Sequence, residues 1–247
     1  MDVFDLSGRV ALVTGGGRGI GAAVSKLLAE ADAAVAINYV SNEQAARDTM
    51  DAIAAAGGRA HVVQGDVARG ADVDRIVAEV EGVLVPVDVL VANAGAGKRL
   101  PIEETTETDF VDTLQNNLIS AFLCSQAVLP GIRERKWGRL IYVSSGAAYN
   151  GGRVGVHYSA SKGGMEALAR AYARRLVEEG ITANCVAPTI ILTDMTSTAR
   201  TSEEIAFSPP VGRHGDVDEV ATAVLMLATN AYMTGQTVHM NGGLYFN

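Results

Sequence analysis

Tyr158 and Lys162 are four residues apart, and Ser145 lies thirteen residues before the tyrosine. On a helix this spacing places both side chains on one face, about 5–6 Å apart at Cβ. A phenol has a pKa of about 10, and a nearby ammonium group lowers it by stabilising the phenolate. The three residues offer a proton donor, a cation that tunes it and a hydroxyl that holds an oxygen, which suits acid–base chemistry on a carbonyl or an alcohol. For the pair alone, the alternative is an ordinary helix with a packed tyrosine and an exposed lysine.

These residues lie in a chain where short apolar runs alternate with helical patterns. The expected strands are 9–13, 33–39, 60–64, 87–92, 139–143, 182–187 and 237–240. The expected helices are 20–30, 42–56, 73–81, 108–133, 157–179 and 217–228. This alternation predicts an α/β fold with a doubly wound parallel sheet and helices on both faces. Residues 193–214 are the least regular stretch, and because they follow a strand we interpret them as a substrate lid.

The composition fits a single domain over residues 1–247, because 48% of the residues are hydrophobic. A formal net charge of −8 argues against nucleic acid or an anionic membrane as the main partner. No apolar run approaches the ~18 residues that span a bilayer, and the first residues lack a signal-peptide pattern, so a cytoplasmic protein is expected. Cys124 and Cys185 stand far apart among apolar neighbours, which predicts two buried thiols, no disulfide and no metal site.

The first expected strand runs into a glycine-rich turn, TGGGRGIG at residues 14–21, and then into a helix. Glycines let the backbone approach a pyrophosphate, and the helix N-terminus attracts its charge. A tight turn without a ligand is the alternative. We expect Gly15, Gly17, Arg18, Gly19 and Ile20 to contact a nicotinamide dinucleotide.

The second expected strand ends in Asn38, Tyr39, Val40 and Ser41, where an NAD site usually places an acidic residue. Because no acid is present, we expect Arg18 to meet the 2′-phosphate of NADP(H), with Asn38, Tyr39 or Ser41 as polar partners. NADP(H) is the preferred cofactor and NAD(H) the alternative. An exposed Arg18 that contacts nothing is the competing interpretation.

Further candidates follow the third and fourth expected strands, at the edge where open α/β sheets bind ligands. They are Asp66-Val67 and Asn93-Ala94-Gly95. Asp66 could accept a hydrogen bond from the adenine amino group, or it could be a turn residue or helix N-cap, as Asp often is.

Taken in order, these motifs resemble the short-chain dehydrogenase/reductase family along essentially the whole chain. The set is TGGGRGIG, Asp66, Asn93-Ala94-Gly95, Asn117, Ser145, Tyr158-x-x-x-Lys162 and the stretch from Pro188 to Thr193. The resemblance implies a Rossmann-like sheet of seven parallel strands and a catalytic tetrad of Asn117, Ser145, Tyr158 and Lys162. It also implies that Pro188, Ile191 and Thr193 belong to the loop beside the nicotinamide.

In the scheme that the resemblance implies, Ser145 orients the substrate oxygen and Tyr158 donates the proton as the nicotinamide delivers hydride. Lys162 binds the nicotinamide ribose and lowers the pKa of the tyrosine, and Asn117 holds a water that resupplies protons. Asn116 and Ser144 are adjacent rivals. The family pattern selects Asn117, and the thirteen-residue gap to Tyr158 selects Ser145.

Within the family, the tail 233–243 and the segment 212–215 look most like those of 3-oxoacyl-[acyl-carrier-protein] reductases. The resemblance also implies a homotetramer in which helices 108–133 and 157–179 pair across subunits. Three departures stand out: Thr189 replaces a usual Gly, Ala92 replaces a commoner Asn, and Asp32 stands where the first helix usually ends in Gly. A β-branched Thr189 cannot easily take a positive φ, whereas Asp32 tolerates one.

An acyl carrier protein is acidic, so a reductase of carrier-bound substrates should have basic residues beside its active site. The cluster Arg133, Arg135, Lys136 and Arg139 could supply them, or it could be a solvated helix end. Glu178-Glu179 stand where carrier-using relatives often have a basic residue. The first hypothesis is therefore an NADPH-dependent reductase of 3-oxoacyl thioesters. The alternatives are an NAD(P)-dependent enzyme acting on a free small ketone, alcohol or sugar, and a nucleotide-binding protein without turnover.

Overall fold

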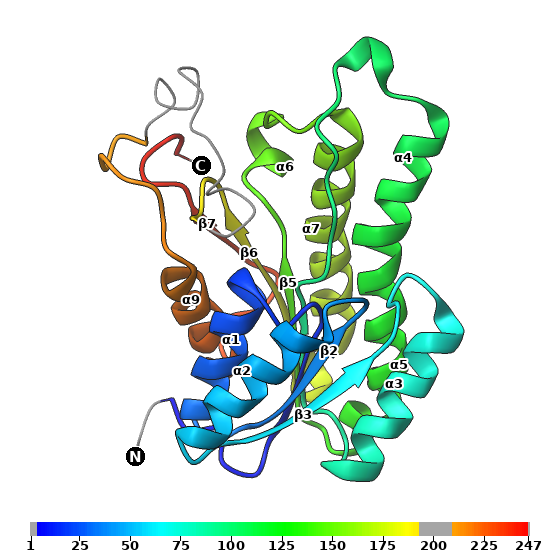
Figure 1. Ribbon diagram of the computed structural model, residues 1–247, viewed down its shortest axis with the longest axis vertical. Helices are drawn as coiled ribbons and strands as arrows, with labels where there is room; N and C mark the ends of the chain where they lie inside the picture. Colours follow the sequence, from blue (N-terminus) through cyan, green and yellow to red (C-terminus); the bar gives the residue numbers. More distant parts are fainter. Residues whose placement is uncertain (1–3, 193–208, 247) are drawn as a thin grey trace.

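The structure is a computed structural model that describes residues 4–192 and 209–246. Within these ranges seven parallel strands form one sheet in the order β3-β2-β1-β4-β5-β6-β7 (Figure 1). The strands are β1 Val10–Val13, β2 Ala34–Tyr39, β3 Arg59–Gln64, β4 Val89–Ala92, β5 Gly138–Val143, β6 Ile181–Pro188 and β7 Thr237–Met240. The predicted seven-stranded parallel sheet is confirmed, and its strand order reverses between β1 and β4.

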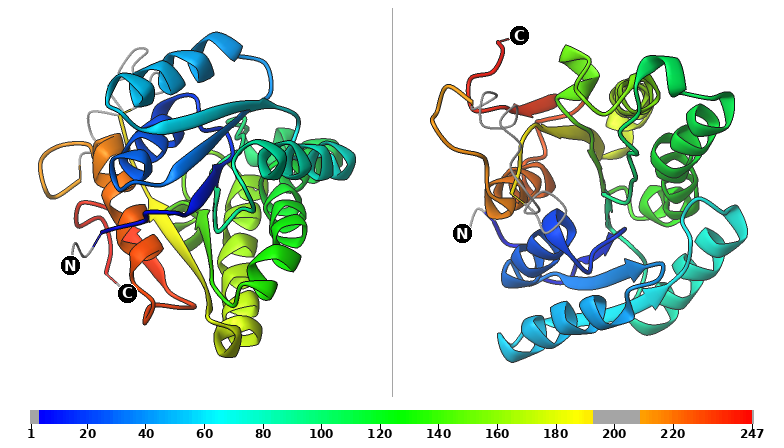
Figure 2. Two further views of the ribbon diagram at one scale, coloured as in Figure 1. Left: turned by 90° about the horizontal axis from the view of Figure 1, so that it is seen from below. Right: turned by 45° about the horizontal axis from the view of Figure 1, so that its top comes forward.

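Helices cover both faces of the sheet, as predicted (Figure 2). One face carries α1 (Gly19–Glu30), α2 (Glu43–Ala55) and α9 (Val217–Thr229). The other carries α3 (Gly70–Val83), α5 (Ser120–Glu134) and α7 (Val156–Leu176). Every residue of β1 and β4 is buried, because helices pack against both sides of these strands.

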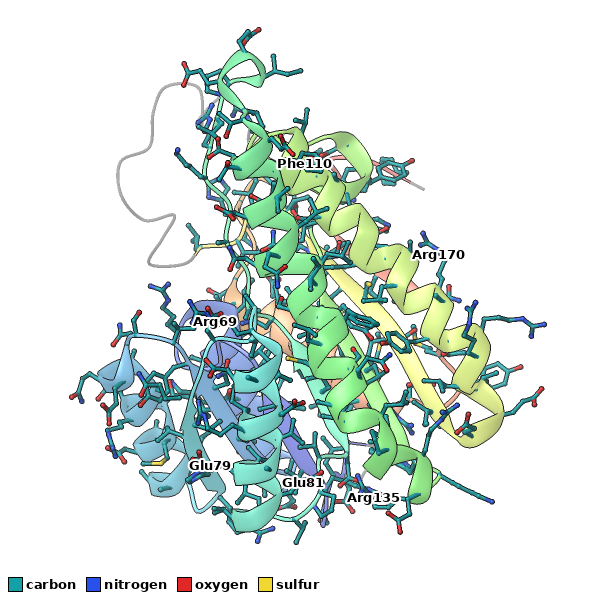
Figure 3. The ribbon with its side chains drawn as sticks, turned by 90° about the vertical axis from the view of Figure 1, so that its right-hand side faces the viewer. Arg69, Glu79, Glu81, Phe110, Arg135 and Arg170 are labelled. Atoms are coloured by element: carbon teal, nitrogen blue, oxygen red, sulfur yellow. The ribbon has the colours of Figure 1, made fainter. Side chains whose placement is uncertain are left out.

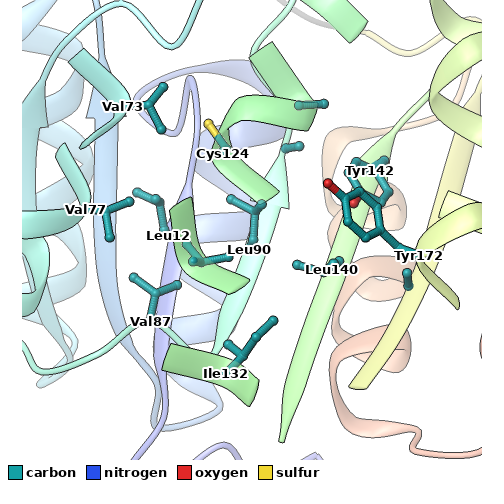
Figure 4. Packing of buried hydrophobic residues seen from close by; sticks show 14 of the residues in the cluster. Leu12, Val73, Val77, Val87, Leu90, Cys124, Ile132, Leu140, Tyr142 and Tyr172 are labelled. Atoms are coloured by element: carbon teal, nitrogen blue, oxygen red, sulfur yellow. The ribbon is translucent and has the colours of Figure 1, made fainter. Parts of the chain in front are cut away.

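The core between the sheet and helices α3, α5 and α7 shows how sheet and helices are held together (Figure 4). Leu12, Leu90 and Leu140 come from three neighbouring strands and pack against Val77 of α3 and Ile132 of α5. Each is largely or fully buried, and burying such a side chain contributes about 1.5–3 kcal/mol. This packing fixes the strand ends that carry the site.

The expected helix over 108–133 is interrupted. It consists of α4 (Glu107–Leu114), a π-helical turn at Gln115–Ile119 and α5. Two short elements were not predicted: a 3₁₀ turn at Ile102–Glu104 and the one-turn helix α6 at Ala147–Asn150. The expected helix over 157–179 ends in a second 3₁₀ turn at Val177–Glu179.

Asp32 ends the turn after α1 in the left-handed conformation, with φ +67°. Its N–H donates to the carbonyl of Ala29 at 3.0 Å, and the N–H of Ala33 donates to that of Leu28 at 3.1 Å. These bonds satisfy carbonyl groups that the helix end leaves open. The prediction that Asp32 replaces the usual glycine is confirmed.

No helix in the two described ranges is long and apolar enough to cross a membrane. The same ranges hold no cluster of three or more His, Cys, Asp or Glu side chains that could bind a metal ion. Cys124 and Cys185 are buried free thiols, as predicted, and burial raises the pKa of each to about 12.

Candidate active site

The carboxyl ends of β1, β4, β5 and β6 lie side by side at the sheet edge that leads into α6 in Figure 1. The glycine-rich turn follows β1, Asn93 follows β4, Ser145 follows β5, and Pro188 ends β6. Open parallel sheets bind ligands at this edge, where the strand order reverses. The topology therefore brings the predicted cofactor residues and the predicted reactive residues together.

Tyr158 lies in the first turn of α7, half-buried and beside the side chain of Ser145. Burial raises the pKa of the phenol, and the nearby hydroxyl of Ser145 lowers this pKa only in part. We expected Lys162 to lower this pKa, but the protein alone does not produce that effect. The Nζ atom of Lys162 is 5.7 Å from the centre of the tyrosine ring and bonds elsewhere.

Lys162 is a buried cation, with 4% of its surface exposed. Its Nζ donates to the carbonyl oxygen of Val143 at 2.8 Å. Burial lowers the pKa of this lysine to about 8, because the apolar surroundings disfavour the charged form. An exposed lysine on an ordinary helix, the alternative for the pair, is excluded.

The geometry distinguishes the two neighbouring serines. Ser144 Oγ lies 3.1 Å from both the carbonyl oxygen of Lys162 and Glu166 Oε1, which share its single hydrogen, so it ties β5 to α7. Ser145 Oγ lies beside the Tyr158 phenol, whose pKa it lowers, and accepts from the N–H of Ala147 at 3.2 Å. The serine chosen from the thirteen-residue gap is the one that contacts the tyrosine.

Asn117 lies fully buried inside the π-helical turn, a feature that often marks functional sites. Its Oδ1 accepts from the N–H of Ala96 at 2.8 Å, and its Nδ2 donates to the Ala96 carbonyl at 3.0 Å and to Ser161 Oγ at 2.9 Å. Both amide hydrogens are therefore used within the protein. The rival Asn116 is exposed and donates to the carbonyl of Asp112. The contact with Ser161 was not predicted from the sequence.

The glycine-rich turn is packed too tightly to carry side chains. Gly15 has φ +61°, and a Cβ at Gly21 would collide with the Gly15 carbonyl oxygen. A Cβ at Gly17 would lie 2.8 Å from Cα of Ala46 in α2. Helix α1 begins at Gly19, so free N–H groups of its first turn, including that of Ile20, lie at this edge of the sheet. The turn is shaped for the close backbone approach of a pyrophosphate.

Asn38 is 1% exposed, and its side chain is fully used within the protein. Its Nδ2 donates to the carbonyls of Val63 and Gly65, and its Oδ1 lies 3.4 Å from the N–H of Gly15. The prediction that Asn38 could contact a 2′-phosphate is therefore wrong, because this amide joins β2, β3 and the glycine turn.

The other predicted residues on the adenosine side have side chains nearer the surface. Arg18 and Ser41 are exposed, and Tyr39 is half-buried. The guanidinium of Arg18 forms no hydrogen bond or ion pair with any residue in 4–192 or 209–246. Within the protein itself, the Arg18 side chain is thus exposed and unpaired, as the competing interpretation holds. A contact between Arg18 and a 2′-phosphate stays a prediction.

Asp66 makes a turn: its Oδ1 accepts from the N–H of Ala68 at 3.0 Å. Its second oxygen is 3.6 Å from Nε of Arg69, which precedes α3. The turn role that sequence left open is present, and the adenine contact stays a prediction. Val67 is buried in the core, so only its backbone could reach a cofactor.

Asn93 locks the end of β4 to the glycine turn. Its Nδ2 donates to the carbonyls of Thr14 and Gly15, at 2.9 and 3.2 Å. Thr14 Oγ1 in turn accepts from the N–H groups of Asn93 and Ala94. This role of Thr14 was not predicted, although its place between a strand and the glycines was a usable signal.

Thr189 does not have a positive φ, in agreement with its β-branched side chain. Its N–H and its Oγ1 both donate to the carbonyl of Met240 at 3.1 Å, which joins the loop to β7. Farther along the loop, Ile191 is buried and pairs with Gly215 in an isolated bridge. Thr193 and residues 193–208 of the expected lid lie outside the described residues.

Comparison with known proteins decides the family. Residues 9–204 match the short chain dehydrogenase family. The chain belongs to this family. It is 36% identical to a 3-oxoacyl-[acyl-carrier-protein] reductase of Staphylococcus epidermidis, over 95% of this chain and 98% of that protein. It is also 36% identical to the reductase of that name from Vibrio cholerae, over 98% and 99%.

Two solved structures have closely similar folds. A putative gluconate dehydrogenase from Agrobacterium tumefaciens has a TM-score of 0.94 and 30% identity, with 99% of this chain and 98% of that chain covered. A 3-oxoacyl (acyl-carrier-protein) reductase from Agrobacterium tumefaciens, with NADP bound, has a TM-score of 0.91 and 31% identity, over 98% and 96%. The protein is thus an NAD(P)-dependent oxidoreductase that acts on CH–OH or C=O groups.

The basic cluster that could either receive a carrier or form a solvated helix end lies at the amino edge of the sheet, away from the active site. Arg133 and Arg135 are at the C-terminal end of α5. Helix α4, the π-helical turn and α5 form one continuous rod, the α4–α5 rod, and Figure 3 shows Arg135 at the end of this rod opposite Phe110. Arg133 pairs with Glu179 at 2.7 Å, and Arg135 pairs with the buried Asp88 at 3.0 Å. These arginines hold together the amino edge of the sheet.

Arg139, at the start of β5, is 3% exposed. Its guanidinium donates to the carbonyls of Ala228 and Gly138, lies 4.2 Å from the centre of the Trp137 ring, and has its pKa lowered to about 10 by burial. Sequence placed this arginine on a surface because charged residues are seldom buried. Arg139 therefore cannot help to dock a carrier at the active site of the same chain.

Proposed function

We propose that this dehydrogenase reduces the ketone of a 3-oxoacyl thioester to a secondary alcohol with NADPH. The observation that carries the proposal is the placement of the Ser145 hydroxyl beside the Tyr158 phenol, close enough to lower its pKa, with the buried Nζ of Lys162 at 5.7 Å from the tyrosine ring. A hydroxyl and a phenol placed in this way can share one substrate oxygen. The phenol can then donate its proton as negative charge develops there.

The four predicted residues take distinct parts. Ser145 Oγ holds the carbonyl oxygen, and Tyr158 gives it the proton. Lys162, with a pKa of about 8, can both bind a ribose hydroxyl and move a proton near neutral pH. Asn117 has no free amide hydrogen, so it would hold a proton-carrying water through an oxygen, Oδ1 or its backbone carbonyl.

The residues present fit a nicotinamide dinucleotide. The crowded turn around Gly15 and Gly21 leaves backbone N–H groups open to a pyrophosphate. Arg18 and Ser41 would hold the 2′-phosphate, Asp66 the adenine, and the segments Asn93–Gly95 and Pro188–Ile191 the nicotinamide side, with Thr193 beyond it. When bound, the nicotinamide supplies the hydride. An unpaired Arg18 and the lack of an acid after β2 favour NADP(H) over NAD(H).

Two sets of relatives support different substrates. The curated relatives at 36% identity are named as reductases of 3-oxoacyl groups on a carrier protein, which supports the thioester. The similar fold of a putative gluconate dehydrogenase supports the second candidate, a free ketone, alcohol or sugar. The position of the arginine cluster away from the site also favours a substrate that needs no basic docking patch.

We further propose that the chain is a single domain that forms a homotetramer in the cytoplasm. Exposed apolar side chains on the α4–α5 rod, at Val111, Ile119 and Phe122, support pairing through this face. Residues 193–214 would form the lid over the substrate.

Initial rates of NADPH and NADH oxidation test the proposed reaction. The substrates are acetoacetyl groups on a carrier protein, on coenzyme A and on a short pantetheine thiol, beside free small ketones and keto sugars. We expect the thioesters to turn over fastest and NADPH to be preferred. Fast ketone or sugar turnover without thioester turnover would support the second candidate. NADPH binding without turnover of any carbonyl would support a nucleotide-binding protein without catalysis.

A further inference from the structure

The loop after β4 forms the wall behind the reactive tyrosine. At its centre is Gly97, an exposed residue without a positive φ. A Cβ at this position would lie 2.8 Å from Cδ2 and 3.0 Å from Cε2 of Tyr158. The loop backbone is therefore in direct contact with the phenol ring, and a shift of the loop would change the space in which that ring moves.

Hydrogen bonds hold the backbone of this loop at three points. The side chain of Asn117 bonds to both backbone polar groups of Ala96. The N–H of Leu100 donates to the carbonyl of Val154 at 3.0 Å. Between them, Nε2 of His157 lies 3.0 Å from the carbonyl oxygen of Lys98. Because a carbonyl only accepts, Nε2 carries the proton and donates it.

A histidine at position 157 costs folding free energy. The side chain is fully buried, and its Nδ1 has no hydrogen-bond partner among residues 4–192 and 209–246. The ring lies against Gly155, where a Cβ would stand 2.7 Å from Nδ1. A buried polar atom without a partner costs free energy. An apolar side chain would avoid that cost, so packing alone does not account for the imidazole.

We propose that His157 is a positioning residue for the reaction: its bond to Lys98 keeps Gly97 against the ring of Tyr158. The inference rests on the proposed function, because it takes Tyr158 as the proton donor. His157 directly precedes Tyr158 on α7. One helical turn therefore carries both the proton donor and the clamp, which is the His157–Lys98 hydrogen bond that holds the loop against the donor. Without the clamp, the loop backbone loses its hydrogen bond between Ala96 and Leu100, and the exposed ion pair of Lys98 with Asp109, at 3.6 Å, remains there.

The matched pair His157→Met and His157→Gln separates positioning from packing. The two new side chains have similar size, but only glutamine can donate to the Lys98 carbonyl. We expect His157→Met to lower kcat by about 10- to 100-fold, the scale of a small misplacement of a reacting group. We expect His157→Gln to retain kcat within about threefold of the wild type. The KM for NADPH should change little in either variant.

Hydrogen–deuterium exchange gives a readout that does not depend on turnover. Backbone amides over residues 96–100 should exchange faster in His157→Met than in His157→Gln or the wild type, while amides of β4 stay protected. His61→Gln is the control, because His61 lies on the edge strand β3 and pairs with Glu79. Equal kcat and equal exchange in the methionine variant and the wild type would overturn the proposal, as would equal losses in both variants.

A second substitution tests the contact from the loop side and does not depend on the folding of a buried variant. Gly97→Ala adds a methyl group that presses on Tyr158, and we expect kcat to fall by about tenfold or more. Gly82→Ala is the matched control, since a Cβ there meets nothing within 4 Å. Unchanged kcat in Gly97→Ala would contradict the proposed wall. If the wild type itself reduced no carbonyl, the proposed function would fail instead, and faster exchange in His157→Met alone would still establish the clamp.

Discussion

Thr189 occupies the space that a side chain at Gly146 would need. The Cγ2 atom of Thr189 overlaps the position of a Cβ at residue 146, and the hydroxyl of Tyr245 lies 2.9 Å from the same point. Gly146 follows the predicted serine, so this contact joins the catalytic strand end to the loop beside the nicotinamide. The departure of Thr189 from the family pattern is thus matched by a neighbour without a side chain.

Gly146→Ala should therefore disturb both stability and activity. An added methyl group in a filled space typically costs about 1–3 kcal/mol. Denaturant unfolding measures the loss of free energy, and steady-state rates measure the effect on kcat. Adding Thr189→Ser removes Cγ2 and keeps the hydroxyl that donates to Met240, so the double variant should recover part of both losses. Additive losses in the double variant would show that the two positions are not coupled.

Lys162→Met should abolish turnover and yet raise the stability at pH 7. Burial lowers the folded-state pKa of Lys162 from 10.5 to about 8, so the unfolded chain binds its proton more tightly. This penalty is present below about pH 8 and is relieved as the pH rises toward 10.5, so wild-type stability gains over that window. The stability advantage of the variant should shrink over the same window, partly offset throughout by the lost bond to Val143.

Urea unfolding of the wild type and Lys162→Met at pH 7, 8, 9 and 10 measures this difference. Lys26→Met is the control, because Lys26 is exposed on α1. A variant less stable than the wild type at pH 7, or a gap that widens toward pH 10, would contradict the assigned cost of burying this cation.

Arg18→Ala should weaken NADPH and spare NADH. A charge-assisted bond from a guanidinium to a phosphate contributes about 1.5–3 kcal/mol, so the Kd for NADPH should rise by about tenfold or more. Fluorescence titration with each dinucleotide checks the result, with Arg47→Ala as a control because Arg47 pairs with Glu43 in α2. An equal loss for both cofactors would place Arg18 on the pyrophosphate instead.

Much of the fold follows from the sequence, because periodic patterns report burial and strand ends report the ligand edge. The choice of Ser145 over Ser144 and of Asn117 over Asn116 also agrees with the geometry. Sequence did not reveal where a polar side chain finds its partners. Asn38 is turned inward by carbonyls on β3 and the turn after it, and Arg139 by carbonyls that include that of Ala228, 89 residues away. Such partners come together only in the folded chain.

The π-helical turn is a similar case. Residues 108–133 have a continuous helical pattern, and nothing local marks the extra residue at Gln115–Ile119. The bonds from Asn117 to Ala96 and Ser161 stabilise the π-helical turn, and both partners lie far outside it in the sequence. The shift in the tyrosine pKa was also mispredicted, because spacing shows that Lys162 is near Tyr158 but does not show that its Nζ donates to Val143.

The central claim is that Tyr158 is the proton donor of an NADPH-dependent carbonyl reduction. The most direct measurement compares single-turnover NADPH oxidation, with saturating acetoacetyl thioester, in the wild type and in Tyr158→Phe. We expect the phenylalanine variant to bind NADPH as the wild type does and to lose hydride transfer by at least about 10²-fold, the usual contribution of a positioned acid. Oxidation of NADPH by Tyr158→Phe at the wild-type rate would contradict the account.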